Sequence, residues 1–251
     1  MVALITGASS GIGYDMAGYL SRKGYDIIAV GRNRDRLEQL KQTLNTKVMI
    51  VETDLSDPEN CKELYFRTRQ MKVDILINDA GFGDLGTFTD TNLDKELSMI
   101  GTNVTAVHIL TKLFLQDMKK RDSGYILNVA SIAAFMPGPL MATYYATKAY
   151  VLRLTEAIRE ELKKSGSHVL VSVLCPGPVA TRFDQVANVE FHLRAKSSDW
   201  VAKKAIDQML QGKMVILPGI DIKLARFACK FVPDRLLAAV AHHMQSKKRG
   251  N

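Results

Sequence analysis

Residues 2–13, VALITGASSGIG, decide the fold. The first five form an apolar run typical of a buried strand, and Gly7, Gly11 and Gly13 follow before a helical pattern begins near residue 12. Glycines at these positions let the backbone turn tightly and approach a pyrophosphate, while the following helix offers free N–H groups and the positive end of its dipole. A plain strand–helix turn would not need three glycines and three small residues. The stretch therefore predicts a phosphate-binding turn after the first strand of an α/β domain.

The same alternation continues along the chain. Six more short apolar runs, separated by longer amphipathic stretches, are expected to be strands: residues 26–30, 47–51, 73–78, 124–130, 168–174 and 214–218. This pattern predicts one doubly wound (Rossmann) parallel sheet of about seven strands with helices on both faces, in a single domain spanning residues 1–251. The longest stretch without periodicity, residues 176–198, follows the sixth strand at the edge where such sheets bind ligands, so we expect it to form a substrate lid.

Composition and charge narrow the class of protein. Of the 251 residues, 47% are hydrophobic and 24% are charged, as in an average globular protein, and no apolar run reaches the roughly 18 residues of a membrane-spanning helix. The N-terminus lacks the features of a signal peptide, and the three cysteines form no CxxC pair. We therefore expect a cytoplasmic protein without a disulfide framework or a metal site. The net charge of +8 comes with no nucleic-acid recognition motif, so no nucleic-acid partner is expected.

The end of the second strand indicates which nucleotide binds. About 20 residues beyond such a glycine turn, an acidic residue usually binds the ribose hydroxyls of NAD. Here the strand ends AVGRNRD, with Gly31 at the position of that acid and Arg32 next to it. A guanidinium makes charge-assisted, bidentate contacts with a phosphate, so the pattern favours NADP(H), through its 2′-phosphate, over NAD(H). The alternative is a surface arginine at a strand end.

A tyrosine and a lysine share one helical face in YYATKAY, residues 144–150. A free tyrosine titrates near 10, so acid–base catalysis near neutral pH needs its pKa lowered by ~2–3 units, or ~3–4 kcal/mol. A positive charge at ~4 Å supplies ~4 kcal/mol at an effective dielectric constant of ~20, so Lys148 is able to lower the pKa of Tyr144 by most of this amount. Taken alone, the pattern is weak, and a surface helix with an incidental lysine explains it better.

Further motifs, in order along the chain, resemble those of the short-chain dehydrogenase/reductase family in its Tyr-x-x-x-Lys branch. They are TGASSGIG at 6–13, NDAG at 78–81, Asn103, Ser131, Tyr144 with Lys148, and PGPVAT at 176–181. The interval from Ser131 to Tyr144 is 13 residues, which is typical of that family, and the resemblance covers essentially the whole chain. It implies hydride exchange between a nicotinamide nucleotide and a carbonyl or alcohol.

The resemblance also implies a role for individual residues. Ser131 is similar to the substrate-polarising serine of the family and Tyr144 to its acid–base. Lys148 is similar to the ribose-binding lysine and Asn103 to the proton-relay asparagine. The expected cofactor contacts are Gly7, Ser9, Ser10, Gly11, Ile12 and Gly13 in the turn, Arg32 at the 2′-phosphate, Asp54 and Leu55 beside the adenine, Asn78, Ala80 and Gly81 along the crevice, Tyr144 and Lys148, Pro176 and Gly177, and Val179 and Thr181 at the carboxamide.

One position departs from the pattern of the family. Its fourth-strand motif usually has two asparagines, whereas Asn78 is followed here by Asp79. An ionised aspartate accepts hydrogen bonds and cannot donate them. If a buried donor is needed at this position, Asp79 must be protonated or the loop rearranged, which bears on local stability more than on the chemistry.

The expected activity is that of an NADP(H)-dependent carbonyl reductase or alcohol dehydrogenase. Apolar residues between Ser131 and Tyr144 are expected to border an apolar substrate such as a ketone, a steroid-like or an acyl compound, or else to belong to the core: Phe135, Met136, Leu140 and Met141. The alternative enzyme is a 3-oxoacyl thioester reductase. The alternative of another class, a non-enzymatic NADP(H)-sensing or scaffolding protein, would be favoured by loss of Ser131, Tyr144 or Lys148, and all three are present.

Two further regions bear on partners. Helices expected around residues 94–119 and 143–164 resemble those that pair subunits in the family, which implies a homodimer or homotetramer. Residues 219–251 contain apolar residues at helical spacing on both sides of Pro233, and carry seven basic residues against two acidic ones from residue 221 onward. This amphipathic, basic extension is expected to cover the core or substrate pocket of the protein itself, the commoner fate of such helices. The alternative is peripheral contact with an anionic membrane surface.

Overall fold

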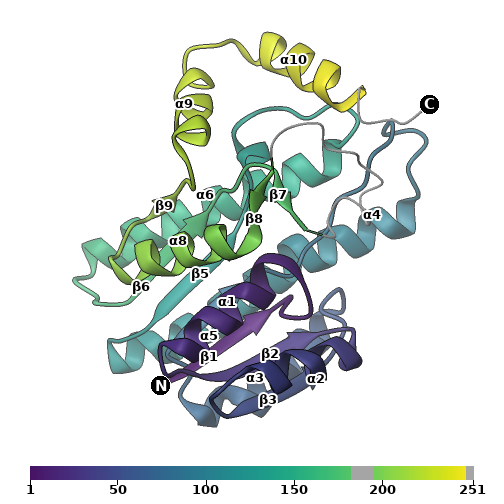
Figure 1. Cartoon of the computed structure of the whole chain (residues 1–251). Helices are drawn as coiled ribbons and strands as arrows, with labels where there is room; N and C mark the ends of the chain where they lie inside the picture. Colours follow the sequence, from purple (N-terminus) through teal and green to yellow (C-terminus); the bar gives the residue numbers. More distant parts are fainter. Residues whose placement is uncertain (182–194, 247–251) are drawn as a thin grey trace.

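Seven parallel strands form the central sheet of the computed structural model, which describes residues 1–181 and 195–246 (Figure 1). In chain order they are β1 (Val2–Thr6), β2 (Asp26–Gly31), β3 (Val48–Glu52), β4 (Ile75–Asn78), β5 (Tyr125–Val129), β6 (Leu170–Leu174) and β9 (Val215–Ile216). Their order across the sheet is β3-β2-β1-β4-β5-β6-β9, and neighbouring strands are parallel. The predicted doubly wound sheet is confirmed. The strand order reverses between β1 and β4, where such sheets open a ligand crevice.

Helices cover both faces of the sheet (Figure 1). One face packs against α1 (Gly11–Arg22), α2 (Arg34–Thr43) and α8 (Ser198–Leu210), and the other against α3 (Pro58–Thr68), α5 (Val107–Arg121) and α6 (Ala142–Lys164). The remaining described elements are shorter or peripheral: η1 (Arg69–Met71), α4 (Leu93–Ile100), η2 (Gly101–Ala106), η3 (Ile132–Phe135), β7 (Val179–Ala180), β8 (Lys196–Ser197), α9 (Ile220–Ala228) and α10 (Asp234–Ser246).

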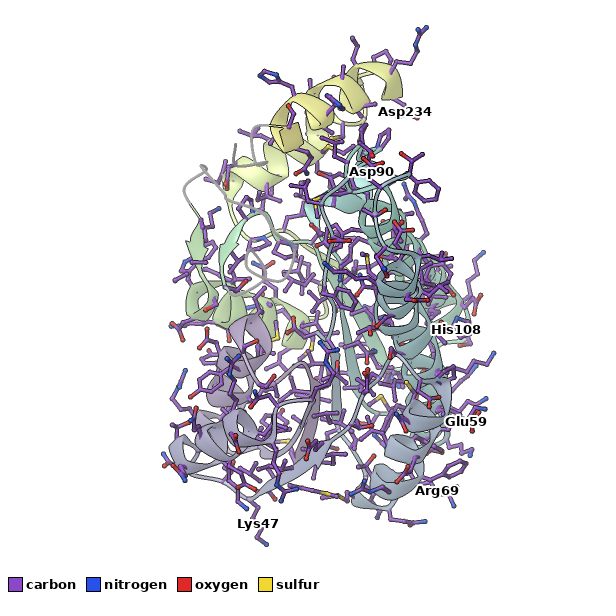
Figure 2. All side chains as sticks on the ribbon, turned by 90° about the vertical axis from the view of Figure 1, so that its right-hand side faces the viewer. Lys47, Glu59, Arg69, Asp90, His108 and Asp234 are labelled. Carbon is purple, nitrogen blue, oxygen red and sulfur yellow. The ribbon has the colours of Figure 1, made fainter. Side chains whose placement is uncertain are left out.

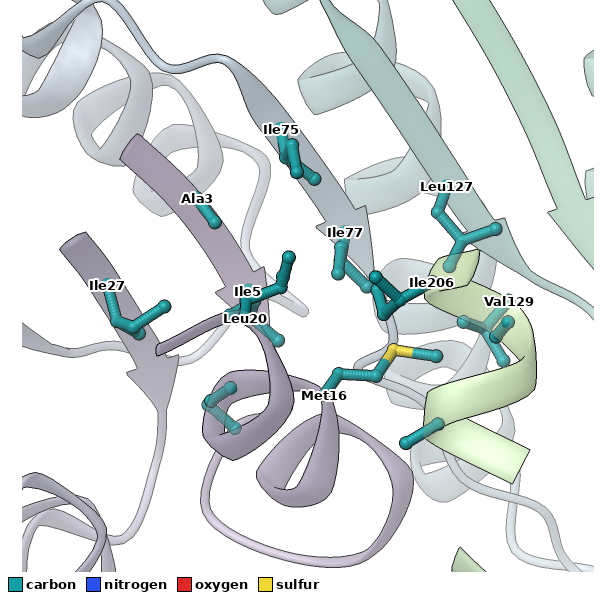
Figure 3. Packing of buried hydrophobic residues seen from close by; sticks show 14 of the residues in the cluster. Ala3, Ile5, Met16, Leu20, Ile27, Ile75, Ile77, Leu127, Val129 and Ile206 are labelled. Carbon is teal, nitrogen blue, oxygen red and sulfur yellow. The ribbon is translucent and has the colours of Figure 1, made fainter. Parts of the chain in front are cut away.

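The core between the sheet and the first helix layer fixes the positions of the strand ends. Met16 and Leu20 of α1 and Ile206 of α8 are fully buried with strand residues that include Ile5 and Ile77 (Figure 3). Because helices cover both faces, successive residues of the inner strands β1, β4, β5 and β6 are nearly all buried, which explains why these strands read as continuous apolar runs. Burial of one such side chain contributes ~1.5–3 kcal/mol.

The helix expected around residues 94–119 is present but irregular. α4 leads into η2, a π-helical stretch of six residues, which leads into α5. Asn103, one of the predicted catalytic residues, lies in this stretch and is fully buried. Short π-helical segments are rare and occur frequently at functional sites, because the extra residue redirects the side chains of one turn.

The predicted lid lies mostly outside the described residues, since positions 182–194 are not described. The described flanks of the lid, β7 and β8, pair in parallel, with Val179 opposite Lys196. The Lys196 N–H also donates to the Pro178 carbonyl at 3.2 Å. The two ends of this segment are therefore held side by side.

The C-terminal extension forms two helices, α9 and α10, with Pro233 between them, as the apolar spacing predicts. The expectation that its apolar stripes cover the core is wrong for α9, where Leu224, Phe227 and Phe231 are exposed. In α10 the expectation holds in part, because Leu237 and Ala241 are buried while Val240 and Met244 of the same stripe are exposed. Among the described residues, the helices include none long and apolar enough to span a bilayer.

Candidate active site

The glycine turn after β1 leaves no room for side chains. Gly7 has a φ of +74°, and a Cβ atom on it would lie 2.9 Å from the Ala80 nitrogen. A Cβ atom on Gly13 would lie 2.6 Å from Oδ2 of Asp79 and 2.8 Å from the Gly7 carbonyl oxygen. All three distances are too short for carbon, so glycine is required at these two positions if the turn is to pack against the loop after β4.

Thr6, the last residue of β1, holds that loop in place. Its hydroxyl oxygen accepts from the backbone N–H groups of Asp79 and Ala80, both at 3.1 Å, and the hydroxyl donates to the Ile77 carbonyl at 3.4 Å. The sequence analysis did not identify Thr6. The available signal was a hydroxyl residue at the end of the first strand, immediately before the glycines.

A cavity of about 670 Å³ opens at the N-terminus of α1. Its lining includes Ser9, Ser10 and Gly11 from the turn, Thr181 after β7, and Arg36 from α2, all at the carboxyl edge of the sheet. The first four were predicted cofactor contacts. Arg36 was not predicted, although it lies four residues after Arg32 in the sequence and carries the same charge.

Arg32 lies just outside this cavity, at the end of β2. Its side chain is exposed, and Nη1 is 3.9 Å from Oδ2 of Asp54, another predicted contact. Asn33 caps α2: its side-chain oxygen accepts from the Arg36 N–H at 3.0 Å. This bond fixes the start of the helix and the position of Arg36 in its first turn.

These residues fit an anionic dinucleotide. Glycines allow close approach of the backbone, the N-terminus of α1 presents N–H groups to a phosphate, and two arginines lie at the adjacent strand end. When bound, a nicotinamide dinucleotide supplies hydride chemistry. Gly7, Ser9, Ser10, Gly11 and Gly13 would hold its pyrophosphate, with Arg32 and Arg36 near its ribose phosphate.

The predicted catalytic residues meet on the other side of the crevice. Tyr144 and Lys148, on α6, are both buried, and the Tyr144 phenol forms a hydrogen bond with the Ser131 hydroxyl at the start of η3. The Lys148 ammonium donates to the Val129 carbonyl at 2.9 Å and lies 5.8 Å from the centre of the Tyr144 ring. Three residues from two different segments therefore form one polar cluster.

The protonation states differ from the expectation that Lys148 lowers the pKa of Tyr144. Burial raises the pKa of the Tyr144 phenol, and the hydrogen bond from Ser131 opposes this only in part. Burial lowers the pKa of Lys148 to about 8, while the nearby Asp79 carboxylate acts in the opposite direction. The ammonium is directed to a backbone carbonyl instead of the phenol, so desolvation decides the pKa of Tyr144.

Asn103 positions the loop that carries Gly81. Its amide donates to the Phe82 carbonyl at 2.8 Å and to the Thr147 hydroxyl at 3.1 Å, and its oxygen accepts from the Phe82 N–H at 3.0 Å. These bonds join the π-helical stretch to both the crevice loop and α6. The proton-relay role implied for Asn103 stays a prediction.

Two predicted cofactor residues point elsewhere. The Asn78 side chain is buried in a polar network, donating to Asn128 at 2.8 Å and to Thr111 at 3.1 Å. Leu55 is buried in the core between the sheet and α3. Side chains of a parallel sheet point to either face, and the motif order alone does not show which. The side chains of Asn78 and Leu55 therefore do not face the crevice, and their contribution to nucleotide binding stays a prediction for their main chains.

The other predicted contacts lie around the crevice. Ile12 packs on the core, and Ala80 and Gly81 follow β4. Val179 is buried in β7, and the Pro176 carbonyl accepts from the Ile132 N–H at 2.9 Å. Gly177 is covered by Ile222 of α9, whose Cδ1 would lie 2.3 Å from a Cβ atom placed there.

Asp79 is a partly buried acid between the two halves of the site. Its carboxylate accepts from the Gly13 N–H and faces Lys148. Burial raises its pKa to about 7, although both of these neighbours favour the ionised form. Protonation or rearrangement was expected here if a buried donor is needed, and the raised pKa favours the protonated form below about pH 7.

Apolar side chains surround the Tyr144 phenol. Phe82, Met99, Ala133 and Met141 are buried with it in one cluster. Met141 was a predicted wall residue, whereas Phe135 packs in a different cluster and lies under the Arg226 guanidinium at 5.1 Å. The Tyr144 phenol thus has polar partners on one side and an apolar cluster on the other.

Comparisons with known proteins agree with this arrangement. A family model described as short chain dehydrogenase matches residues 1–190. An uncharacterized oxidoreductase of Staphylococcus epidermidis is 36% identical over 182 residues, which cover 72% of this chain and 78% of that protein. Another, from Staphylococcus aureus, is 32% identical over 225 residues, which cover 88% of this chain and 96% of that protein.

Similar solved structures include a short-chain dehydrogenase from Sphingobium yanoikuyae in complex with NADPH, with a TM-score of 0.83 and 27% identity over 100% of this chain and 97% of that one. A Burkholderia phymatum short-chain dehydrogenase/reductase in complex with NAD has a TM-score of 0.82 and 25% identity, covering 90% and 91%. A bulky-bulky ketone specific alcohol dehydrogenase from Comamonas testosteroni has a TM-score of 0.77 and 26% identity, covering 94% and 98%. With its glycine turn and its Ser131–Tyr144–Lys148 cluster, the chain belongs to the short-chain dehydrogenase family of oxidoreductases.

Proposed function

We propose that the protein is an NADP(H)-dependent oxidoreductase that interconverts a carbonyl and a secondary alcohol on an apolar substrate. The observation that carries this proposal is the hydrogen bond between Ser131 and Tyr144, whose phenol is buried with apolar side chains beside the crevice that the glycine turn borders. A phenol and a hydroxyl together suit one substrate oxygen, since one group transfers a proton while the other stabilises developing charge.

The protein groups have separate tasks in carbonyl reduction. Because burial keeps the Tyr144 phenol protonated at neutral pH, the phenol donates the proton to the substrate oxygen. The Ser131 hydroxyl donates a hydrogen bond to the same oxygen as it becomes negative. Lys148 keeps positive charge near the phenol and is oriented by the Val129 carbonyl. The surrounding apolar side chains exclude water, which strengthens these interactions.

The preference for NADP(H) rests on Arg32 and Arg36. One arginine stands at the position after the missing acid, and the other lines the cavity itself. The similar structures include complexes with NADPH and with NAD, so these two arginines, and not the fold, support the choice.

The preference for an apolar ketone rests on the cluster around Tyr144. Phe82, Ala133 and Met141 provide no charged or strongly polar partner for the rest of a substrate. The similar alcohol dehydrogenase from Comamonas testosteroni is described as specific for bulky-bulky ketones, which is the class of substrate that such a wall would accept.

The proposal is tested by NADPH oxidation, followed at 25 °C with bulky ketones, steroid ketones and 3-oxoacyl thioesters. We expect turnover with ketones, and Tyr144→Phe should lower it at least about a hundredfold while NADPH binding is retained. Tyr145→Phe, which changes the neighbouring phenol on the same helix, is the matched control. Normal turnover by the Tyr144→Phe variant would refute the catalytic assignment, and turnover confined to thioesters would refute the substrate class.

A further inference from the structure

We propose that α9 and α10, termed here the C-terminal arm (residues 220–246), form a docking surface for an anionic lipid bilayer. Both views show these helices at one end of the molecule. In Figure 2, Asp234, which begins α10, lies opposite Lys47 and Arg69 (Figures 1 and 2). This inference is independent of the proposed reaction.

The first observation is an apolar face on α9 that packs on nothing in the described chain. Ile220, Leu224, Phe227 and Phe231 are between 61% and 74% exposed. Their spacing of four, three and four residues places them on one side of the helix and its following turn. The rings of Phe227 and Phe231 also lie 4.9 Å apart between centroids, so this side presents a continuous aromatic surface.

The second observation is a similar division in α10. Leu237, Ala241 and Gln245 face the protein and are buried, whereas Leu236, Val240 and Met244 are between 43% and 58% exposed. The exposed residues again repeat every four positions and share one side. A surface helix normally exposes a polar side, so an apolar side turned outward indicates a further contact.

The arm is held to the protein by other residues, so its exposed apolar side is not needed for packing. On α9, Ile222 is buried against Gly177, and Arg226 lies over the Phe135 ring and 3.9 Å from Glu156. On α10, the Gln245 amide donates to the Tyr145 hydroxyl at 2.7 Å. These contacts leave the apolar side free to bind something else.

The charge of the arm indicates which partner binds its exposed side. Lys223, Lys230 and Arg235 are exposed beside the apolar residues, and the sequence continues with Lys247, Lys248 and Arg249. Of the two acids, Asp221 forms an ion pair with Lys196. A second copy of this chain would bring like charges together on this face, whereas anionic lipid headgroups would neutralise them. Apolar side chains with basic flanks, on protruding helices, are the features of interfacial membrane binding.

The arm also contacts the neighbour of a catalytic residue. Tyr145, which Gln245 holds, packs edge-on against Tyr144 with ring centroids 6.1 Å apart. A docked arm would therefore place the apolar wall of the site near the bilayer, from which an apolar substrate would enter. This consequence, unlike the docking itself, rests on the proposed function.

Co-sedimentation with vesicles tests the docking. The full chain is mixed with vesicles of phosphatidylcholine alone or with 30% phosphatidylglycerol, at low and high salt. We expect binding to the anionic vesicles that weakens with salt. The double variant Phe227→Ser/Phe231→Ser should bind at least about tenfold more weakly, and Lys230→Gln/Arg235→Gln about thirtyfold more weakly, at ~1 kcal/mol per basic residue.

Matched variants control for side-chain type and total charge. Phe66→Ser removes an equally exposed phenylalanine from α3, and Lys41→Gln/Lys47→Gln removes two exposed lysines far from the arm. Both should bind vesicles like the parent protein. Circular dichroism and nucleotide binding would show that every variant is folded.

Three results would overturn the proposal. One is the absence of binding to anionic vesicles by the folded protein. Another is equal binding to neutral vesicles without salt dependence, which would remove the electrostatic argument. The third is self-association that the Phe227→Ser/Phe231→Ser variant abolishes in sedimentation velocity, without vesicle binding by the parent protein, which would make the arm a subunit interface.

Discussion

Replacing Asp79 by asparagine tests the electrostatics of the buried site. The carboxyl lies between the Gly13 N–H and Lys148, and burial raises its pKa from 3.8 to about 7. A buried acid whose pKa is raised on folding stabilises the folded state below its unfolded pKa, and this contribution is lost as the pH rises through the folded value. The wild-type protein should therefore lose stability between about pH 4 and pH 7, and Asp79→Asn should not.

The size of the effect follows from the shift. Three pKa units at ~1.4 kcal/mol each give ~4 kcal/mol. This is the upper bound for how much the stability difference between Asp79→Asn and wild type increases from about pH 4 to about pH 8. The opposing effect of Lys148 is already contained in the Asp79 pKa of about 7. Burial lowers the pKa of Lys148 from 10.5 to about 8, so the stability linked to its own titration changes between these two values, and the Asp79 carboxylate opposes the lowering. Removing the carboxylate should therefore lower the pKa of Lys148 further.

Urea unfolding of both proteins at half-unit steps from pH 5 to pH 8 measures the difference. The free energy of unfolding of Asp79→Asn, minus that of wild type, should increase across this range. Asp117→Asn is the control, because a hydrogen bond from the Tyr65 hydroxyl lowers the pKa of Asp117 and keeps it ionised throughout. Its difference from wild type should be constant. A constant difference for Asp79→Asn as well would mean that Asp79 does not titrate there.

Further predictions concern the cofactor, the turn and the assembly. NADPH should bind at least about tenfold more tightly than NADH in fluorescence titrations, and Arg32→Ala or Arg36→Ala should reduce that ratio; unchanged ratios would refute the role of both arginines. Gly13→Ala, whose Cβ atom would lie 2.6 Å from Oδ2 of Asp79, should weaken nucleotide binding and lower the melting temperature; a variant that matches wild type in both would show that the turn can relax. Leu97→Glu, on the exposed side of α4, should dissociate the expected dimer or tetramer in analytical ultracentrifugation, and a wild-type monomer at all concentrations would refute assembly.

The sheet could be predicted because its physical signal is local. Strands buried on both faces must be apolar at every position, so runs such as residues 26–30 stand out from the amphipathic helices around them. The glycine turn is equally readable, because the close approach to Ala80 and Asp79 excludes every other residue type. The glycine turn packs against a loop far along the chain, yet its three closely spaced glycines can be recognised from a few neighbouring positions.

Features that depend on side-chain direction could not be predicted in the same way. A hydrophobic stripe on α9 indicates an amphipathic helix, but it does not show whether the stripe faces the core, and Ile222, outside that stripe, is the residue that packs inward. Asn78 has the position that the family motif requires, yet its amide turns to Asn128 within the sheet. Arg36 was not predicted because the sequence does not show that the first turn of α2 faces the crevice.

The position of the Lys148 ammonium explains why the pKa of Tyr144 is not lowered. Spacing on a helix places Tyr144 and Lys148 one above the other, but the ammonium also finds a buried acceptor, the Val129 carbonyl, which the sequence pattern does not reveal. Because the pKa of Tyr144 is above its ordinary value of 10.0, less than about one phenol in a thousand is ionised at pH 7. Carbonyl reduction needs the protonated phenol and alcohol oxidation the phenolate. Under the proposed function, the rate of oxidation should therefore rise relative to the rate of reduction as the pH increases.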